Sequence, residues 1–171
     1  MIQEQLAPGK LVHFFDSTLG YCESRLFEVC KALHALKHKF ILSCDIRAEF
    51  LTEKTLKALE DAGFREIRVG LEAADSRVLE KNNRKILPDT VMDKIKLVRK
   101  NSGLYLTLYT VSGLPGFTLE TYRKNQEIYR YLLETRSVDE IKNAQYVPYP
   151  RDNMDLTGKG VIRMEEKRVN Y

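Results

Sequence analysis

Residues 62–72 read AGFREIRVGLE, and this stretch decides the fold class. Gly63 is typical of a helix end. The run that follows, residues 67–72, alternates in the way that a β-strand requires. One face of this strand is aliphatic, with Ile67, Val69 and Leu71, and the other face carries Arg68, Gly70 and Glu72. If the aliphatic face packs on helices, the charged face lines a concave interior, so we expect a sheet covered by helices on one side.

The same rhythm recurs on both sides of this stretch, as a short apolar run followed by an amphipathic helix. The predicted strands are residues 11–15, 40–44, 67–72, 104–111 and 141–149. The predicted helices lie around residues 26–36, 52–63, 78–79, 88–103 and 118–134. Thr52 and Thr118 are suited to cap their helices, and Pro88 suits a first helical turn. The chain therefore predicts an α/β fold.

Helical crossovers between consecutive strands require parallel pairing. Five strands are too few to close an eight-stranded barrel. We therefore expect an open, partial barrel of five parallel strands, with a doubly wound sheet as the alternative. Nothing in the composition marks an internal boundary, so residues 1–171 form one unit, in which residues 151–171 are weakly patterned.

The composition excludes several classes of function. The 28 basic and 24 acidic side chains are mixed along the chain, whereas nucleic-acid binders gather basic residues on one face. No apolar run reaches the 18 residues of a membrane span, and the first residues do not resemble a signal peptide. Three cysteines are an odd number, which indicates reduced thiols and a cytoplasmic location.

Ligands of parallel α/β proteins gather at the carboxyl ends of the strands. The residues at these exits are Asp16, Arg47, Glu72, the turn of Gly113, Leu114, Pro115 and Gly116, and Tyr149. A charged side chain on the concave face must be paired or must meet a ligand. For Arg68 and Glu72 both readings stay open: they pair with neighbours in the sheet, or they serve a bound molecule.

Familiar metal and nucleophile motifs are missing. His34 and His38 are four residues apart but lack the glutamate of the metalloprotease motif, so we expect surface histidines. His13 is expected to be packed or hydrogen-bonded. The spacing of Cys22, Cys30 and Cys44 matches no zinc or iron–sulfur pattern, and we expect them to be structural. The sequence holds neither a P-loop nor the glycine motif of dinucleotide binding.

Seven segments, in order, resemble the radical S-adenosylmethionine enzymes. They are VHFFDSTL (12–19), CDIR (44–47), AGFREIRVGLE (62–72), VL (78–79), NRK (83–85), VSGLPG (111–116) and YVPYP (146–150). The resemblance covers roughly residues 10–156 and is closest to the cobalamin-associated branch, which includes the anaerobic magnesium-protoporphyrin monomethyl ester cyclase and related methyltransferases. Phe117 and Arg151 depart from the family pattern, which usually has glutamate and glycine at these positions.

The resemblance implies a partial α/β barrel of six units, of which this chain would supply strands two to six. It implies S-adenosylmethionine and a 4Fe–4S cluster as cofactors of the full-length enzyme, and cobalamin through a separate domain. In the family, a loop with three cysteines after the first strand binds the cluster. That loop has no counterpart among these residues, so we expect a fragment that is inactive in isolation.

The resemblance also implies roles for single residues. Glu72 would contact the ribose of S-adenosylmethionine, and Arg84 would contact its carboxylate. The turn of Gly113, Leu114, Pro115 and Gly116 would approach the adenine, and Asp16 and Arg47 would line the pocket. We expect Glu72, Arg84 and the turn to meet at one mouth of the sheet.

Two other functions remain open. The chain is either a non-catalytic small-molecule-binding or regulatory module that kept the sheet and lost the cluster, or an ordinary α/β enzyme whose motifs are coincidental. The expected partner is a small-molecule substrate, whose identity the sequence does not give. The strand at residues 11–15 is expected to form an exposed sheet edge through which the chain self-associates.

Overall fold

The computed structural model describes residues 9–15, 19–36 and 40–148. Five parallel strands form a single sheet in the order β1-β2-β3-β4-β5. The strands are β1 (Leu11–Phe14), β2 (Ile41–Asp45), β3 (Phe64–Glu72), β4 (Tyr105–Ser112) and β5 (Glu140–Gln145). The helices are α2 (Glu23–Ala35), the 3₁₀ turn η1 (Ala48–Phe50), α3 (Glu53–Asp61), α4 (Ser76–Lys81), α5 (Pro88–Asn101) and α6 (Leu119–Glu134).

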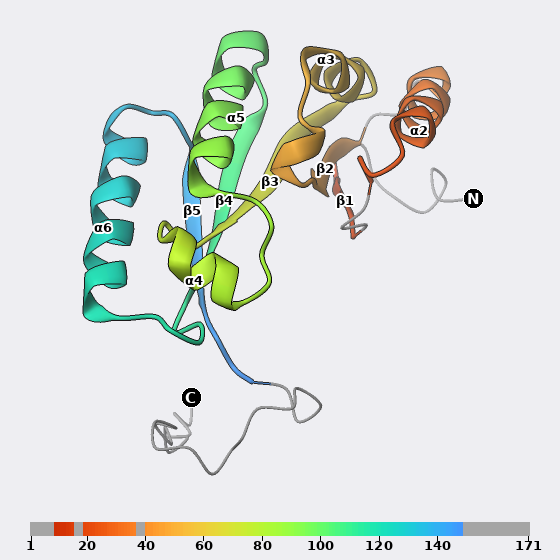
Figure 1. Ribbon diagram of the computed structural model, residues 1–171. Helices are drawn as coiled ribbons and strands as arrows, with labels where there is room; N and C mark the ends of the chain where they lie inside the picture. The colour runs from red at the N-terminus through yellow and green to blue at the C-terminus, as the bar shows by residue number, and fades with distance from the viewer. Residues whose placement is uncertain (1–8, 16–18, 37–39, 149–171) are drawn as a thin grey trace, which may run out of the picture.

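The strands follow one another across the sheet in chain order, and β1 and β5 form its two edges within the described residues. A doubly wound sheet reverses its strand order at a switch point, so the doubly wound alternative is wrong. The helices α3, α5 and α6 lie in front of the sheet on one face (Figure 1). The open, parallel, helix-covered sheet predicted from the sequence is confirmed.

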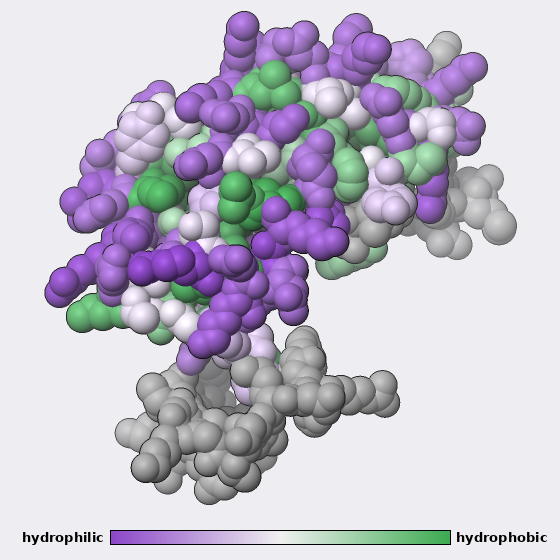
Figure 2. Space-filling view, in the orientation of Figure 1, coloured by the Kyte–Doolittle hydropathy of each residue, from purple (hydrophilic) through white to green (hydrophobic). Residues whose placement is uncertain are grey.

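The core lies between the sheet and these helices. Along β3 the side chains of Ile67, Val69 and Leu71 are at most 2% exposed, which confirms the predicted aliphatic face. Leucines of α3 and aliphatic residues of α5 cover this face: Leu56, Leu59, Val91, Ile95 and Val98. The outer face of the helices is mostly hydrophilic with separate hydrophobic patches (Figure 2), as expected for a surface in contact with water.

The helix starts follow the sequence signals. The Thr52 side chain accepts a hydrogen bond from the backbone N–H of Thr55 (3.1 Å), and the Thr55 hydroxyl accepts one from the Thr52 N–H (2.8 Å), which completes a capping box. Thr118 caps α6 by accepting a hydrogen bond from the backbone N–H of Thr121 (3.2 Å), and Pro88 begins α5. None of the described helices is long and apolar enough to cross a membrane.

Two strand boundaries differ from the prediction by three residues or more, and the others by one residue at most. β3 starts at Phe64, three residues early, because Gly63 turns the chain directly from α3 into the sheet and Phe64 is fully buried. β5 ends at Gln145 instead of reaching Tyr149, and residues 146–148 have no regular structure. Tyr149 and the tail of residues 151–171 lie outside the described residues.

Candidate functional site

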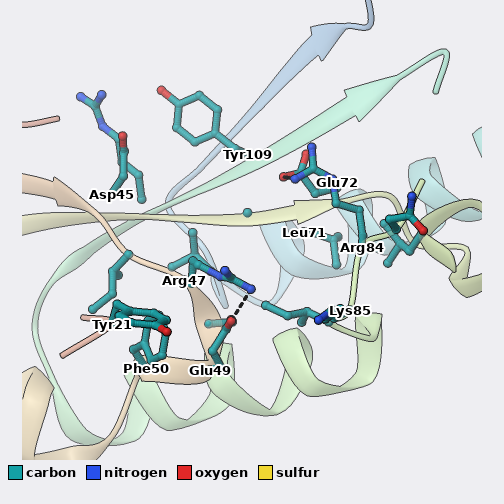
Figure 3. Close-up of a pocket in the computed structure, with 18 of the residues that line it drawn as sticks. Tyr21, Asp45, Arg47, Glu49, Phe50, Leu71, Glu72, Arg84, Lys85 and Tyr109 are labelled. Carbon is teal, nitrogen blue, oxygen red and sulfur yellow. Dashed lines mark ion pairs between the residues drawn. The ribbon is translucent and has the colours of Figure 1, made fainter. Parts of the chain in front are cut away.

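A cavity of about 860 Å³ opens at the carboxyl ends of β1, β2 and β3. Its walls come from segments that are far apart in sequence: residues 45–50 after β2, residues 68–72 of β3, residues 83–86 after α4, and Phe15, Tyr21, Leu79 and Tyr109 (Figure 3). The volume lies within the range of about 300–1,000 Å³ that is usual for small-molecule sites. Three predicted site residues, Glu72, Arg84 and Arg47, line it.

The end of β3 is irregular where it meets this cavity. The pairing with β4 shifts between Gly70 and Glu72, so that one residue of β3 bulges out of the ladder. Glu72 has a φ angle of +64°, a left-handed conformation that costs an ordinary residue about 1–2 kcal/mol. Bulges next to active sites redirect side chains, and here the bulge places the Glu72 carboxylate over Gly70. A side chain at Gly70 would begin 3.3 Å from Glu72 Oε1.

Arg84 reaches the cavity from the end of α4. Asn83 has a φ of +53°, and the backbone N–H of Arg84 donates to the Leu79 carbonyl at 2.8 Å. These bonds form the usual left-handed ending of a helix, which turns the chain sharply at Asn83. The Arg84 Nη1 atom lies 3.9 Å from Glu72 Oε1, and the two side chains are 54% and 29% exposed. This long, hydrated contact leaves both groups available to a ligand.

The Glu72–Arg84 end of the cavity is fixed to α6 through Asp75. The Asp75 carboxylate caps α4 by accepting from the backbone N–H of Arg77 at 3.0 Å and from its guanidinium at 2.9 and 3.1 Å. The Thr121 hydroxyl of α6 donates to the same carboxylate at 3.3 Å. Hydrogen bonds from Arg77 are the main reason that the pKa of Asp75 falls to about 2. α4 is therefore held by an ionised, buried carboxylate.

The concave face of the sheet carries its own ion pair. Arg68 donates from Nε to Glu66 Oε1 at 2.8 Å, and the Thr107 hydroxyl donates to the same oxygen at 3.2 Å. Burial alone would raise the pKa of Glu66, but the bonds from Arg68 and Thr107 outweigh it and lower that pKa. Of the two possibilities for Arg68, pairing within the sheet or binding a ligand, the structure shows pairing within the sheet. Glu72 has only the distant contact with Arg84 among the described residues.

The opposite wall of the cavity combines a salt bridge with aromatic rings. Arg47 Nη2 lies 2.5 Å from Glu49 Oε1, and the Arg47 guanidinium carbon lies 5.9 Å from the centre of the Phe50 ring. The rings of Tyr21 and Phe50 meet edge to face with 6.0 Å between their centres. In Figure 3, Tyr21 and Phe50 stand side by side, away from Glu72 and Arg84.

The glycine turn does not reach this cavity. Leu114 is 5% exposed and packs with Ala73, Val78 and Leu79 in a small second core. The Asn82 side chain donates to the Pro115 carbonyl at 2.9 Å. α4 therefore stands between the turn and the cavity. The structure brings Glu72, Arg84 and Arg47 together and leaves Gly113, Leu114, Pro115 and Gly116 behind α4; Asp16 lies outside the described residues.

The histidines that the structure describes follow the expectations. His13 contacts Ser43 Oγ at 2.8 Å and Asp45 Oδ2 at 3.4 Å, and His34 contacts the Asp61 carbonyl at 2.7 Å. His38 lies outside the described residues.

The cysteines are free thiols. Cys30 and Cys44 are buried and Cys22 is exposed. Burial raises the pKa of Cys30 to about 11, which makes it an unreactive thiol. Within the described part of the chain, no group of three or more His, Cys, Asp or Glu side chains is placed to hold a metal ion.

Comparison with known proteins identifies the family. Residues 12–132, more than half of the chain, match the family model of the radical SAM superfamily. The chain belongs to this superfamily. An uncharacterized methyltransferase of Pyrococcus horikoshii is 23% identical over 141 residues, which make up 82% of this chain and 30% of that protein. This radical SAM chain therefore spans less than a third of its curated relative.

Several solved structures share the fold. The methyltransferase TsrM of Kitasatospora setae, determined with cobalamin and a 4Fe–4S cluster, superposes with a TM-score of 0.63 at 19% identity, covering 79% of this chain and 25% of TsrM. Coproporphyrinogen III oxidase of Escherichia coli gives 0.64 at 17% identity, covering 82% and 32% of the two chains. Elp3 of Methanocaldococcus infernus gives 0.64 at 15%, covering 80% and 37%. At these identities the likeness establishes the partial-barrel fold.

The donor set of the cavity fits S-adenosylmethionine. A carboxylate accepts hydrogen bonds from paired hydroxyls, and a guanidinium binds a carboxylate through a fork of donors. Glu72 and Arg84 offer these two groups side by side, and Gly70 leaves the space that the Glu72 carboxylate occupies. The described residues do not fit an iron–sulfur cluster, since Cys30 and Cys44 are buried and no suitable group of ligands is assembled.

The sequence analysis did not predict the aromatic side chains of this cavity. Phe15, Tyr21 and Phe50 line the cavity, although they come from three separate segments. The available signal was weak: Phe15 ends a predicted strand, and Tyr21 and Phe50 each lie six residues beyond one, near the strand exits where ligands of parallel sheets gather.

Proposed function

We propose that this chain is part of the catalytic core of a radical S-adenosylmethionine enzyme, an oxidoreductase or methyltransferase, and supplies the pocket for S-adenosylmethionine and substrate. Glu72 holds the ribose hydroxyls and Arg84 holds the carboxylate of S-adenosylmethionine. The observation that carries the proposal is the left-handed Glu72 at the end of β3, beside Arg84, in a chain of this superfamily. Backbone strain of this kind persists where function selects it.

In this proposal the cluster and any cobalamin are held by parts of the enzyme outside these residues. When bound, the cluster supplies the electron that cleaves S-adenosylmethionine. The residues of this chain orient the cofactor and substrate and exclude water from them, which is the usual contribution of protein to cofactor chemistry. The 171 residues alone are therefore inactive. A cytoplasmic location goes with the proposal, because Cys22, Cys30 and Cys44 are free thiols.

Isothermal titration calorimetry with S-adenosylmethionine tests the two binding roles. Glu72→Gln and Arg84→Gln each remove a charged partner, and a hydrogen bond to a charged group contributes about 1.5–3 kcal/mol, equivalent to about 10- to 150-fold in affinity. The matched controls are Glu127→Gln and Arg123→Gln, both exposed on α6 and outside the cavity. Unchanged affinity in the two cavity variants would disprove the assignment.

A second experiment tests whether this chain alone can assemble the cluster and catalyse the reaction. The chain is incubated with iron, sulfide, a reductant and S-adenosylmethionine, and its absorption spectrum and the formation of 5′-deoxyadenosine are measured. We expect neither a stoichiometric 4Fe–4S spectrum nor turnover. A complete cluster on this chain would contradict the proposal that its ligands lie elsewhere.

The alternative is a non-catalytic module that binds a small molecule. Both functions account for the lack of a metal-ligand group among the described residues. The upstream reading frame separates the two functions: a Cys-x-x-x-Cys-x-x-Cys segment joined to this chain supports the enzyme, and its absence from the complete gene supports the module.

A further inference from the structure

The cavity has a second, apolar end that the roles of Glu72 and Arg84 do not use. Phe15 and Tyr21 are 88% and 74% exposed although both line the cavity, and the Phe50 ring contacts the Tyr21 ring edge to face. We call Phe15, Tyr21 and Phe50 the aromatic wall. Exposed aromatic side chains that gather in one concave site mark a place of binding, because each ring buries a large apolar surface when a ligand covers it.

The wall is built into the fold and is not a chance gathering of surface rings. Gly20 is buried against Phe50, and a Cβ atom at this position would lie only 2.7 Å from the Phe50 Cβ. The absence of a side chain at Gly20 therefore lets the segment before α2 approach η1 closely enough for Tyr21 to meet the Phe50 ring edge to face. Phe15 is fixed in turn by an edge-to-face contact with His13, with 4.5 Å between the ring centres.

The geometry of the wall favours a flat, unsaturated ring. Aromatic pairs prefer edge-to-face or offset-stacked contacts, and a ligand ring can extend such a cluster through the same contacts. Arg47 adds a planar cation beside Phe50, and a guanidinium stacks on aromatic faces. Its charge is balanced by Glu49, so the site does not demand a charged ligand.

Tyr21 and Phe50 of the wall lie at a different end of the cavity from the Glu72–Arg84 pair (Figure 3). Phe15 follows β1 and Phe50 follows β2, whereas Glu72 ends β3. Neighbouring strands lie about 4.8 Å apart, so a ring against the β1 side lies roughly 10 Å from the β3 side. That separation accommodates two ligand groups at once.

We propose that the aromatic wall binds a planar aromatic or heteroaromatic ring of the substrate, next to S-adenosylmethionine held by Glu72 and Arg84. This inference rests on the proposed function and adds the substrate class to it. The adenine of S-adenosylmethionine is the other planar ring that could reach the wall, and the experiment separates the two.

The probe is 2-naphthoate, and its matched control is the saturated decahydro-2-naphthoate, which has the same skeleton and charge but no π system. Binding to the chain is measured by calorimetry or by NMR line broadening. We expect 2-naphthoate to bind more tightly than the saturated probe. Tyr21→Leu and Phe50→Leu keep apolar bulk but remove a ring, and each is expected to weaken 2-naphthoate binding by about 2- to 12-fold.

Tyr131→Leu, an exposed tyrosine of α6 outside the cavity, is the matched variant and is expected to change nothing. If Phe50→Leu does not fold, Tyr21→Leu still tests the proposal, because Tyr21 is an exposed side chain whose replacement leaves the core intact. Saturating S-adenosylmethionine is expected to leave 2-naphthoate affinity unchanged, and the wall variants are expected to leave S-adenosylmethionine affinity unchanged.

Three results would overturn the inference without touching the proposed function: equal binding of the saturated probe, insensitivity to Tyr21→Leu, or competition between 2-naphthoate and S-adenosylmethionine, which would assign the wall to adenine. Concentration-dependent dimerisation that Tyr21→Leu abolishes would assign the wall to a second copy of the chain and overturn it too. Failure of the proposed function has a separate signature, which is S-adenosylmethionine affinity that Glu72→Gln does not change.

Discussion

Replacing Asp75 by asparagine tests how the functional end of the cavity is held in place. The Asp75 side chain is 5% exposed and receives hydrogen bonds from Arg77 and from Thr121. α4 begins at this carboxylate and ends two residues before the Asn83–Arg84 turn. Removing the charge should therefore loosen both α4 and the position of Arg84.

The magnitude follows from the pKa of Asp75, which falls from 3.8 to about 2, chiefly through the hydrogen bonds from Arg77. At 1.36 kcal/mol per pKa unit this shift would contribute up to about 2.5 kcal/mol to folding. Arg77 is 68% exposed, however, so water screens the pair and about 1–2 kcal/mol is a realistic value. Because the pKa is lower in the folded state, the stabilisation is fully present above pH 3.8 and is lost as the pH falls toward 2.

Urea denaturation followed by circular dichroism measures the free energy of unfolding of both proteins between pH 7 and pH 3. Asp75→Asn should be less stable by about 1–2 kcal/mol at pH 7, and the difference should shrink toward pH 3. Glu120→Gln removes an exposed partner of the same Arg77 and should have little effect. Equal stability at pH 7, or a difference that stays constant with pH, would refute the reasoning.

Four further outcomes are expected. Gly70→Ala should weaken S-adenosylmethionine binding in calorimetry without lowering the free energy of unfolding, because its Cβ would lie 3.3 Å from Glu72 Oε1 while its own φ is ordinary. Glu72→Gly should be more stable to urea than Glu72→Ala by about 1 kcal/mol, because only glycine relieves the left-handed strain; both should lose S-adenosylmethionine affinity. Gly116→Ala should lower the free energy of unfolding by about 1–2 kcal/mol, since its φ is +87° and its Cβ would meet a lysine of α4 at 2.9 Å. Light scattering at high concentration should show self-association through the β1 edge, and a strictly monomeric chain would contradict it.

The fold was largely predictable because its signals are local. A short segment of sequence is enough to predict an alternating strand such as β3 or a threonine-capped helix such as α3. The crossover argument then fixes parallel pairing from chain order alone. Boundaries were less predictable: whether Phe64 joins β3 depends on its burial under distant helices, and no local pattern contains that information.

The candidate site was predictable only in part. Glu72 was predicted from its strand exit and from the family resemblance, and Arg84 from the resemblance alone; the two side chains lie together as expected. The partner of Arg68 was not predictable from the sequence. Either the Glu66 carboxylate or a bound ligand can accept hydrogen bonds from the guanidinium, and only the structure shows that it is Glu66. The glycine turn was expected at the same mouth, but nothing in the sequence says that α4 comes between them.

The bulge before Glu72 explains why a strained residue can stand where a regular strand would place none. β4 keeps its regular alternation, and Glu72 pairs with Thr110 instead of lying one residue further along. The backbone beyond it is held on both sides: Ala73 donates to the Leu71 carbonyl at 2.8 Å, and Ala74 donates to the Asn125 side chain of α6 at 2.8 Å. Since α6 fixes the chain just after the strained residue, the roughly 1–2 kcal/mol of left-handed strain is retained in the folded state and cannot relax by local adjustment. The helices that stabilise the sheet thus also hold the conformation that directs Glu72 toward the cavity.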